Sequence, residues 1–173
     1  MVKQLSTFSE HLAGKTRSNR DLLYKGNQWT RGSEQLKAFQ QIKSDLTQAP
    51  VLALYDPNKE TKVAADASSF GLSGVILQLQ PDNPWRPVSF ISRAKIPTET
   101  RSTQIEKEAL AFTWACEQSW EYIVGKSISV ETDREPLVPP LSTLTLDQLP
   151  PRIQRFRMRL IRFSFKIKHV PGK

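Results

Sequence analysis

The sequence is short of several residue types, and each shortage excludes a class of protein. Cys116 is the only cysteine, which excludes an internal disulfide and fits a reducing compartment. His11 and His169 are the only histidines, and no Cys/His cluster accompanies them, so we expect no zinc site. No apolar run approaches the ~18 residues that span a bilayer, and the first residues lack a signal-peptide core. We therefore expect an intracellular protein, cytoplasmic or nuclear, with no membrane partner.

The last part of the chain contains no acidic residue. From Pro150 to Lys173 there are eight Lys and Arg residues, which equals the net charge of +8 of the whole chain. A basic segment on a folded domain favours a polyanionic partner, most often nucleic acid; a solvated cationic surface without a partner is the alternative. Guanidinium groups suit phosphate oxygens. The candidate nucleic-acid-binding residues share one face of a predicted helix and are Arg152, Arg155, Arg159 and Arg162.

The hydrophobic pattern changes at Pro50. Before it, the chain reads as helical, with two short helices that end at Gly14 and Gly26 and a longer one capped by Ser33. We expect residues 1–50 to form a helical segment distinct from the rest of the chain.

Residues 51–173 read as a single α/β domain. Three strand patterns separated by Gly, Pro and Asn come first, followed by a long helix over about 103–124 and a fourth strand. A basic helix with proline in its first turn and a fifth alternating strand complete the order. Because a strand–helix–strand unit favours a parallel, right-handed crossover, we expect a mixed sheet flanked by helices.

Three carboxylates fall at positions that suit one site. Asp66 ends the first predicted strand and Asp133 ends the fourth, so parallel pairing of these strands would place the two acids side by side. On the long helix, Glu108 lies at the edge of the buried stripe, whereas Glu106 lies on the far edge, nearer solvent. The stripe itself is predicted to consist of Ile105, Ala109, Phe112, Cys116 and Ile123. Carboxylates that converge repel one another unless a cation joins them, and Mg²⁺ or Mn²⁺ suits hard oxygen ligands.

Each acid also has an ordinary structural explanation. Asp66 could begin a turn, Glu108 could be a helix-surface residue, and Asp133 could be a helix N-cap. Spacing alone does not decide between these explanations and a metal site.

Several longer motifs closely resemble one family. They are "ADASSFGLSGVILQ", "PVSFISR", "TRSTQIEKEALAFTWACEQSWEYIVGK", "VETDREPL" and "LPPRIQRFRMRLIRFSFKIKHVPGK". In this order and spacing they resemble the RNase H domain of gypsy-type LTR retrotransposon polyproteins. The part before Pro50 resembles the segment that joins the reverse transcriptase thumb to RNase H.

The resemblance implies a fold, a chemistry and a set of residues. The fold would be the RNase H-like mixed five-stranded sheet, and the reaction would be hydrolysis of the RNA strand of an RNA–DNA hybrid with two Mg²⁺ or Mn²⁺ ions. Motif by motif, the catalytic and metal-binding acids would be Asp66, Glu108 and Asp133. The partners would be the hybrid and the remainder of the reverse transcriptase polyprotein, in the cytoplasm, the nucleus or virus-like particles.

The sequence departs from the family pattern at four places. Ser102 stands where an aromatic residue is usual, and Arg134 and Glu135 stand where "TDHKPL" is the usual form. The family's fourth acid follows "PGK", whereas this sequence ends at Lys173, so we expect a domain truncated at its C-terminus with one metal site poorly held. Two functions are compatible with this sequence: a ribonuclease H, or a weakly active or inactive nucleic-acid-binding or connection module.

Overall fold

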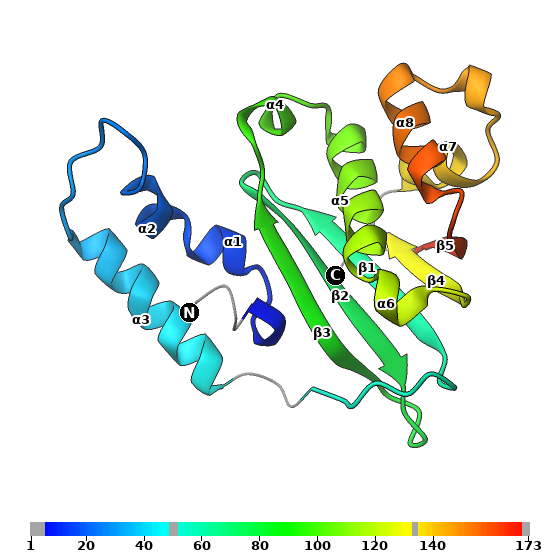
Figure 1. Cartoon of the computed structure of the whole chain (residues 1–173), viewed down its shortest axis with the longest axis horizontal. Coiled ribbons are helices and arrows are strands. Elements are labelled where there is room, and N and C mark those ends of the chain that lie inside the picture. The colour runs from blue at the N-terminus through cyan, green and yellow to red at the C-terminus, as the bar shows by residue number, and fades with distance from the viewer. Residues whose placement is uncertain (1–5, 49–51, 133–134, 171–173) are drawn as a thin grey trace.

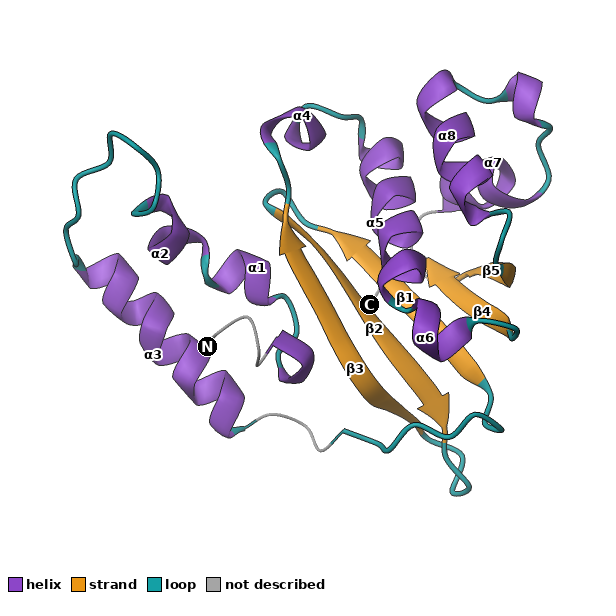
Figure 2. Ribbon diagram, viewed as in Figure 1, coloured by secondary structure: helices purple, strands orange, loops and turns teal. Residues whose placement is uncertain are grey.

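One mixed sheet of five strands organises the chain (Figures 1 and 2). The structure, a computed structural model, describes residues 6–48, 52–132 and 135–170. The strands are β1 (Thr61–Ala67), β2 (Gly71–Leu79), β3 (Trp85–Ala94), β4 (Ser127–Thr132) and β5 (Ser164–His169). Their order is β3-β2-β1-β4-β5; β1, β2 and β3 are antiparallel neighbours, whereas β4 is parallel to both β1 and β5. The predicted α/β class with a mixed five-stranded sheet is confirmed.

Helices that come after β3 in the chain cover one face of the sheet. They are α4 (Pro97–Thr100), α5 (Gln104–Gln118), α6 (Trp120–Ile123), α7 (Val138–Ser142) and α8 (Pro151–Leu160), with 3₁₀ turns at Glu135–Leu137 and Leu146–Gln148. α5 lies against β1 and β2, and α8 packs beside α5. α5 approaches β2 closely at Gly74, where an added Cβ would lie only 3.2 Å from the Cβ of Ala115. The main apolar core therefore lies between α5, α8 and the sheet.

The N-terminal segment forms α1 (Leu12–Lys15), α2 (Arg17–Asp21) and α3 (Ser33–Thr47). The backbone N–H of Ala13 donates to Ser92 Oγ of β3 at 2.9 Å, which fixes α1 to the sheet. α3 packs on α1 and α2 and lies far from α5 and α8 in Figure 1.

Some predicted helix details are wrong. Gly14 lies inside α1, and the helix before Gly26 ends at Asp21, whose carbonyl accepts a hydrogen bond from the Asn27 side-chain amide at 2.5 Å. The N-cap of α3 is Gly32 rather than Ser33.

The long helix differs from its prediction in two respects. It breaks at Ser119 into α5 and α6. Within the predicted buried stripe, Ile105 is 42% exposed because it lies in the first turn of α5, beyond the edge of the core.

Candidate active site and nucleic-acid interface

Asp66 lies near the end of β1 and is exposed. Its cross-strand partner in β2 is Ser73, and the preceding pair, Ala65 and Gly74, faces α5. Because side chains alternate along a strand, Asp66 and Ser73 project from the opposite face of the sheet. The side chain of Asp66 therefore lies on the face of the sheet against which the N-terminal segment packs.

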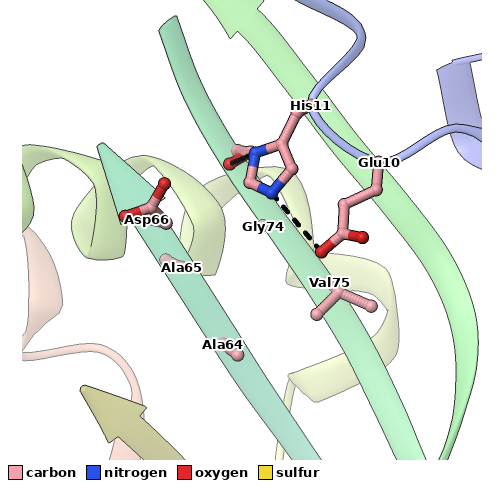
Figure 3. A pocket seen from close by; sticks show the side chains of 8 residues that line it. Glu10, His11, Ala64, Ala65, Asp66, Gly74 and Val75 are labelled. Atoms are coloured by element: carbon pink, nitrogen blue, oxygen red, sulfur yellow. Dashed lines mark hydrogen bonds and ion pairs between the residues drawn. The ribbon is translucent and has the colours of Figure 1, made fainter. Parts of the chain in front are cut away.

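A cavity of about 240 Å³ lies beside Asp66, between β1, β2 and the N-terminal segment (Figure 3). His11 enters it, with its Nδ1 2.9 Å from Ser73 Oγ and its Nε2 3.4 Å from Glu10 Oε1. His11 has a positive φ of 53°, an uncommon conformation for a residue other than glycine. These contacts make residues 10 and 11 part of the surroundings of Asp66.

Glu108 lies on the other side of the sheet and is only 4% exposed. It accepts a hydrogen bond from Gln104 Nε2 at 2.6 Å, one turn earlier in α5. Together with Ala65 of β1 and Thr132 of β4, it lines a small cavity under the ends of these strands. Burial of a carboxylate costs free energy unless it is compensated, which makes this residue more than an ordinary helix-surface glutamate.

Glu106 has a different role from Glu108, in agreement with its predicted position on the far edge of the helix. Its Oε2 accepts a hydrogen bond from the backbone N–H of Thr103 at 3.0 Å, which completes a capping box at the start of α5. The same carboxylate lies 3.6 Å from Arg152 of α8. Glu106 therefore stabilises the helix start and the packing of α8.

The strands that lead to the two candidate aspartates are parallel neighbours, with Ala64 of β1 paired with Glu131 of β4. β4 ends at Thr132. Asp133 and Arg134 lie outside the described residues, so the convergence of Asp66, Glu108 and Asp133 stays a prediction. Within the described ranges, no three His, Cys, Asp or Glu side chains gather closely enough to hold a metal ion.

Lys95 is a charged residue at this end of the sheet that sequence reasoning missed. It comes directly after β3 and is 8% exposed, and its Nζ donates to the carbonyl of Ser68 at 2.5 Å. Burial lowers the pKa of Lys95, Lys107 lowers it further, and the charges of Glu108, Glu99 and Asp66 oppose the shift. The sequence does show that Lys95 comes directly after an apolar strand. It does not show that the Lys95 side chain turns toward the carbonyl of Ser68, because that carbonyl is placed by the turn after β1.

Ser102, one of the departures from the family pattern, has a buried hydroxyl without a hydrogen-bond partner among the described residues. Glu135 begins the 3₁₀ turn after β4 and is exposed.

The predicted arginine row lies on α8, but most of its members contact acids of α5. Arg152 pairs with Glu106, while Arg159 and Arg162 both pair with Glu117, Arg159 through Nε at 2.9 Å. These contacts raise the pKa of Arg159, with the Glu117 hydrogen bonds as the main cause.

Arg155 is exposed, and the described part of the chain offers it no ion-pair partner. Arg157, which lies off the row, donates to the carbonyls of Pro140 at 3.2 Å and Ser142 at 3.0 Å and also to that of Leu144. Arg155 is therefore the member of α8 most available to a phosphate, and Arg157 is a structural clamp on α7.

One family model matches more than half of the chain. It is described as the RNase H-like domain found in reverse transcriptase, and it matches residues 29–130. The chain belongs to this family. The RNase H-like match starts within the N-terminal segment, upstream of α3, and extends into β4.

Relatives of this RNase H-like domain occur in retrotransposon polyproteins. The chain is 32% identical over 83% of its length to the Pol polyprotein of transposon 297 and 28% identical over 99% to that of transposon 412, both from Drosophila melanogaster. It is 26% identical over 99% of its length to the Tf2-3 polyprotein of Schizosaccharomyces pombe. The chain spans only 13% of the length of each of these relatives.

Solved structures support the same fold. A foamy viral protease–reverse transcriptase in complex with RNA/DNA hybrid matches 99% of this chain and 24% of its own, with a TM-score of 0.75 and 19% identity. The foamy viral protease–reverse transcriptase dRH in complex with double-stranded DNA gives a TM-score of 0.76 at 17% identity over 99% of this chain and 31% of its own. The part of the chain that the structure describes contains no helix of sufficient length and apolar character to cross a membrane.

Proposed function

We propose that the chain is the ribonuclease H domain of a retrotransposon reverse transcriptase and hydrolyses the RNA strand of RNA–DNA hybrids. The observation that carries the proposal is the parallel pairing of β1 with β4 above the buried carboxylate of Glu108. A metal site here would join Asp66, near the end of β1, to Glu108 and to Asp133, which follows β4 in the sequence. We also propose that the chain divides into a helical connection segment, residues 1–50, and an RNase H-like domain, residues 51–173.

The donor chemistry of this end of the sheet fits a divalent cation. Asp66 and Glu108 supply hard carboxylate oxygens, and Glu108 is held in a buried position by Gln104. Asp66, Glu108 and Asp133 would hold Mg²⁺ or Mn²⁺, two ions in a complete site. When bound, the ions would activate the attacking water and stabilise the leaving 3′ oxygen. Gln104 orients Glu108, and the turn after β1 fixes the end of the strand that carries Asp66.

Substrate binding is assigned to α8. Its exposed guanidinium groups, with Arg155 foremost, would contact phosphate oxygens and thereby position the duplex without reading its sequence. A hybrid would be distinguished by its A-like shape and its 2′-hydroxyls. The remainder of the polyprotein is the proposed protein partner, in the cytoplasm, the nucleus or virus-like particles.

Cleavage of a labelled RNA–DNA hybrid with Mg²⁺ or Mn²⁺ tests the proposal. The expected result is slow metal-dependent cleavage, faster with Mn²⁺, that Asp66→Asn and Glu108→Gln abolish. Asp82→Asn is the matched control because Asp82 lies in the exposed β2–β3 hairpin, paired with Arg86. Cleavage that survives Asp66→Asn would overturn the site.

A second function, a nucleic-acid-binding or connection module with little catalysis, is favoured by Glu135, an exposed acid in the turn after β4 where the family pattern has a lysine. It predicts salt-dependent hybrid binding without metal-dependent cleavage.

A further inference from the structure

The turn from β1 to β2 presents an aromatic ring shortly after Asp66 in the chain. Phe70 lies in this turn and is 45% exposed. Two hydrogen bonds hold its backbone: the Phe70 N–H donates to Ser68 Oγ at 3.3 Å, and the Phe70 carbonyl accepts the N–H of Lys95 at 3.1 Å. The ring is therefore fixed on the surface, beside the strand end that carries Asp66.

Arg17 of α2 lies over this ring. Its guanidinium carbon is 3.7 Å from the centroid of Phe70, which is within the range of a cation–π contact. The N-terminal segment that carries Arg17 is itself anchored on the sheet by the hydrogen bond from Ala13 to Ser92. In Figure 1, α2 and α8 lie far apart, on opposite sides of α5. Arg17 thus places a positive charge at the end of the sheet from the side opposite to α8.

Arg17 differs from the other cations of α1 and α2 in how weakly it is paired. Lys15 pairs with Asp45 at 2.6 Å, and Arg20 donates to a backbone carbonyl of α1 at 2.6 Å. Among the described residues, the acid that Arg17 meets is Asp21, with 3.9 Å between Nε and Oδ2, and the two side chains are 51% and 49% exposed. An ion pair this long and this exposed contributes little, so the guanidinium can bind another anion.

We propose that Arg17, oriented by Phe70, is a second phosphate contact for the duplex, which the N-terminal segment supplies on the Asp66 side of the sheet. The inference rests on the proposed function, because it takes the nucleic acid as the ligand. A guanidinium stacked on a ring keeps its edge N–H groups directed outwards, and this edge can donate two hydrogen bonds to a phosphate. Arg17 and Arg155 of α8 would hold the duplex at two separate points and thereby limit its rotation above the acids. The contact reads no sequence.

Fluorescence anisotropy of the full chain with a labelled RNA–DNA hybrid, in EDTA and at several salt concentrations, tests the proposal. Arg17→Gln should weaken binding about five- to tenfold at about 0.1 M salt and reduce the slope of log affinity against log salt by about one unit. Phe70→Leu should weaken binding about two- to fivefold and keep the slope, because the charge stays but the ring that orients it is lost.

Arg31→Gln is the matched control. It removes the same charge from the same segment, and Arg31 also lies near a ring, that of Phe39, at 5.9 Å. The loop before α3, which carries Arg31, lies far from the sheet in Figure 1. Arg31→Gln should therefore bind the hybrid as the wild type does. Equal weakening in Arg31→Gln and Arg17→Gln would overturn the proposal, because the effect would then reflect net charge alone.

The salt slope separates a phosphate contact from a purely structural stack. If Arg17→Gln lowers thermal stability but keeps the wild-type slope, Arg17 only holds the segment on the sheet and the proposal is wrong. Arg17→Lys is the second variant in case Arg17→Gln does not fold. It keeps the charge without the planar fork, so it should keep the slope and bind about two- to fivefold more weakly, and wild-type affinity would contradict the proposal.

Arg155→Ala distinguishes failure of this inference from failure of the proposed function. If Arg155→Ala weakens hybrid binding but Arg17→Gln does not, substrate binding by α8 stands and the second contact is wrong. If the wild-type chain does not bind the hybrid at all, the proposed function and the inference fail together.

Discussion

Cys116 shows how burial sets the chemistry of one side chain. It lies on α5 against the sheet with no exposed surface, and burial raises the pKa of its thiol well above the ordinary value of 9.0. In the unfolded chain the thiol ionises near pH 9, while in the folded chain it keeps its proton. The unfolded state therefore binds fewer protons above pH 9, and this group makes stability fall as pH rises.

The corresponding prediction concerns the pH dependence of unfolding. Above pH 9, Cys116 should lower the free energy of unfolding by up to about 1.4 kcal/mol per pH unit. Urea denaturation at pH 8 and pH 10 measures this slope, and Cys116→Ala is the control because it lacks the thiol. Equal slopes in the two proteins would contradict the prediction.

The sequence predicted the position of a single residue correctly where helix geometry alone determines which side chain is buried. The 100° rotation per residue separates Glu108, which is buried, from Glu106, which caps α5. It failed for Lys95, because the burial of this ammonium depends on a carbonyl that only the folded turn after β1 places there.

At the scale of elements, α8 combines two roles on one helix. Ile153, Phe156 and Leu160 are buried against the core, as the amphipathic pattern predicted. The sequence also predicted the arginine row, but it could not show that Glu106 and Glu117 of the neighbouring α5 lie within reach of that row. Contacts between helices depend on how the sheet positions them, and no local pattern reports that position.

This division of α8 gives a prediction for hybrid binding. Arg155→Ala should weaken binding whatever the sequence and reduce the slope of log affinity against log salt by about one unit. Adding Arg159→Ala should bring the reduction to about one to two units, since Arg159 must first leave Glu117. Fluorescence anisotropy with a labelled hybrid at several salt concentrations measures the slope.

Arg157→Ala is the matched control within the same helix. Its guanidinium binds backbone carbonyls of α7 and the loop after it, so its loss should lower thermal stability and leave the salt slope unchanged. A normal slope in Arg155→Ala would mean that the row faces away from the nucleic acid.

For the whole molecule, the decisive arrangement is the docking of the N-terminal segment beside Asp66. The five strands and the hairpin spacing of the first three were predictable from alternation and turn residues, because these are local patterns. The docking was not, because it depends on His11 meeting Ser73 and on Ala13 meeting Ser92 across long stretches of chain. The guanidinium of Arg17, 3.7 Å above the ring of Phe70, adds a third contact.

Hydrogen exchange tests this docking. Each hydrogen bond contributes on the order of 1 kcal/mol, so the double variant His11→Ala, Ser92→Ala should speed amide exchange in α1 and α2 by about tenfold or more. Amides of α5 should be unaffected, because its core lies on the other face of the sheet. Ser129→Ala is the control, as Ser129 lies in β4 away from the docked helices. Unchanged exchange in α1 would contradict the prediction and would mean that other contacts hold the N-terminal segment on the sheet. In that case the segment would still border the cavity beside Asp66 when the His11 side chain is removed.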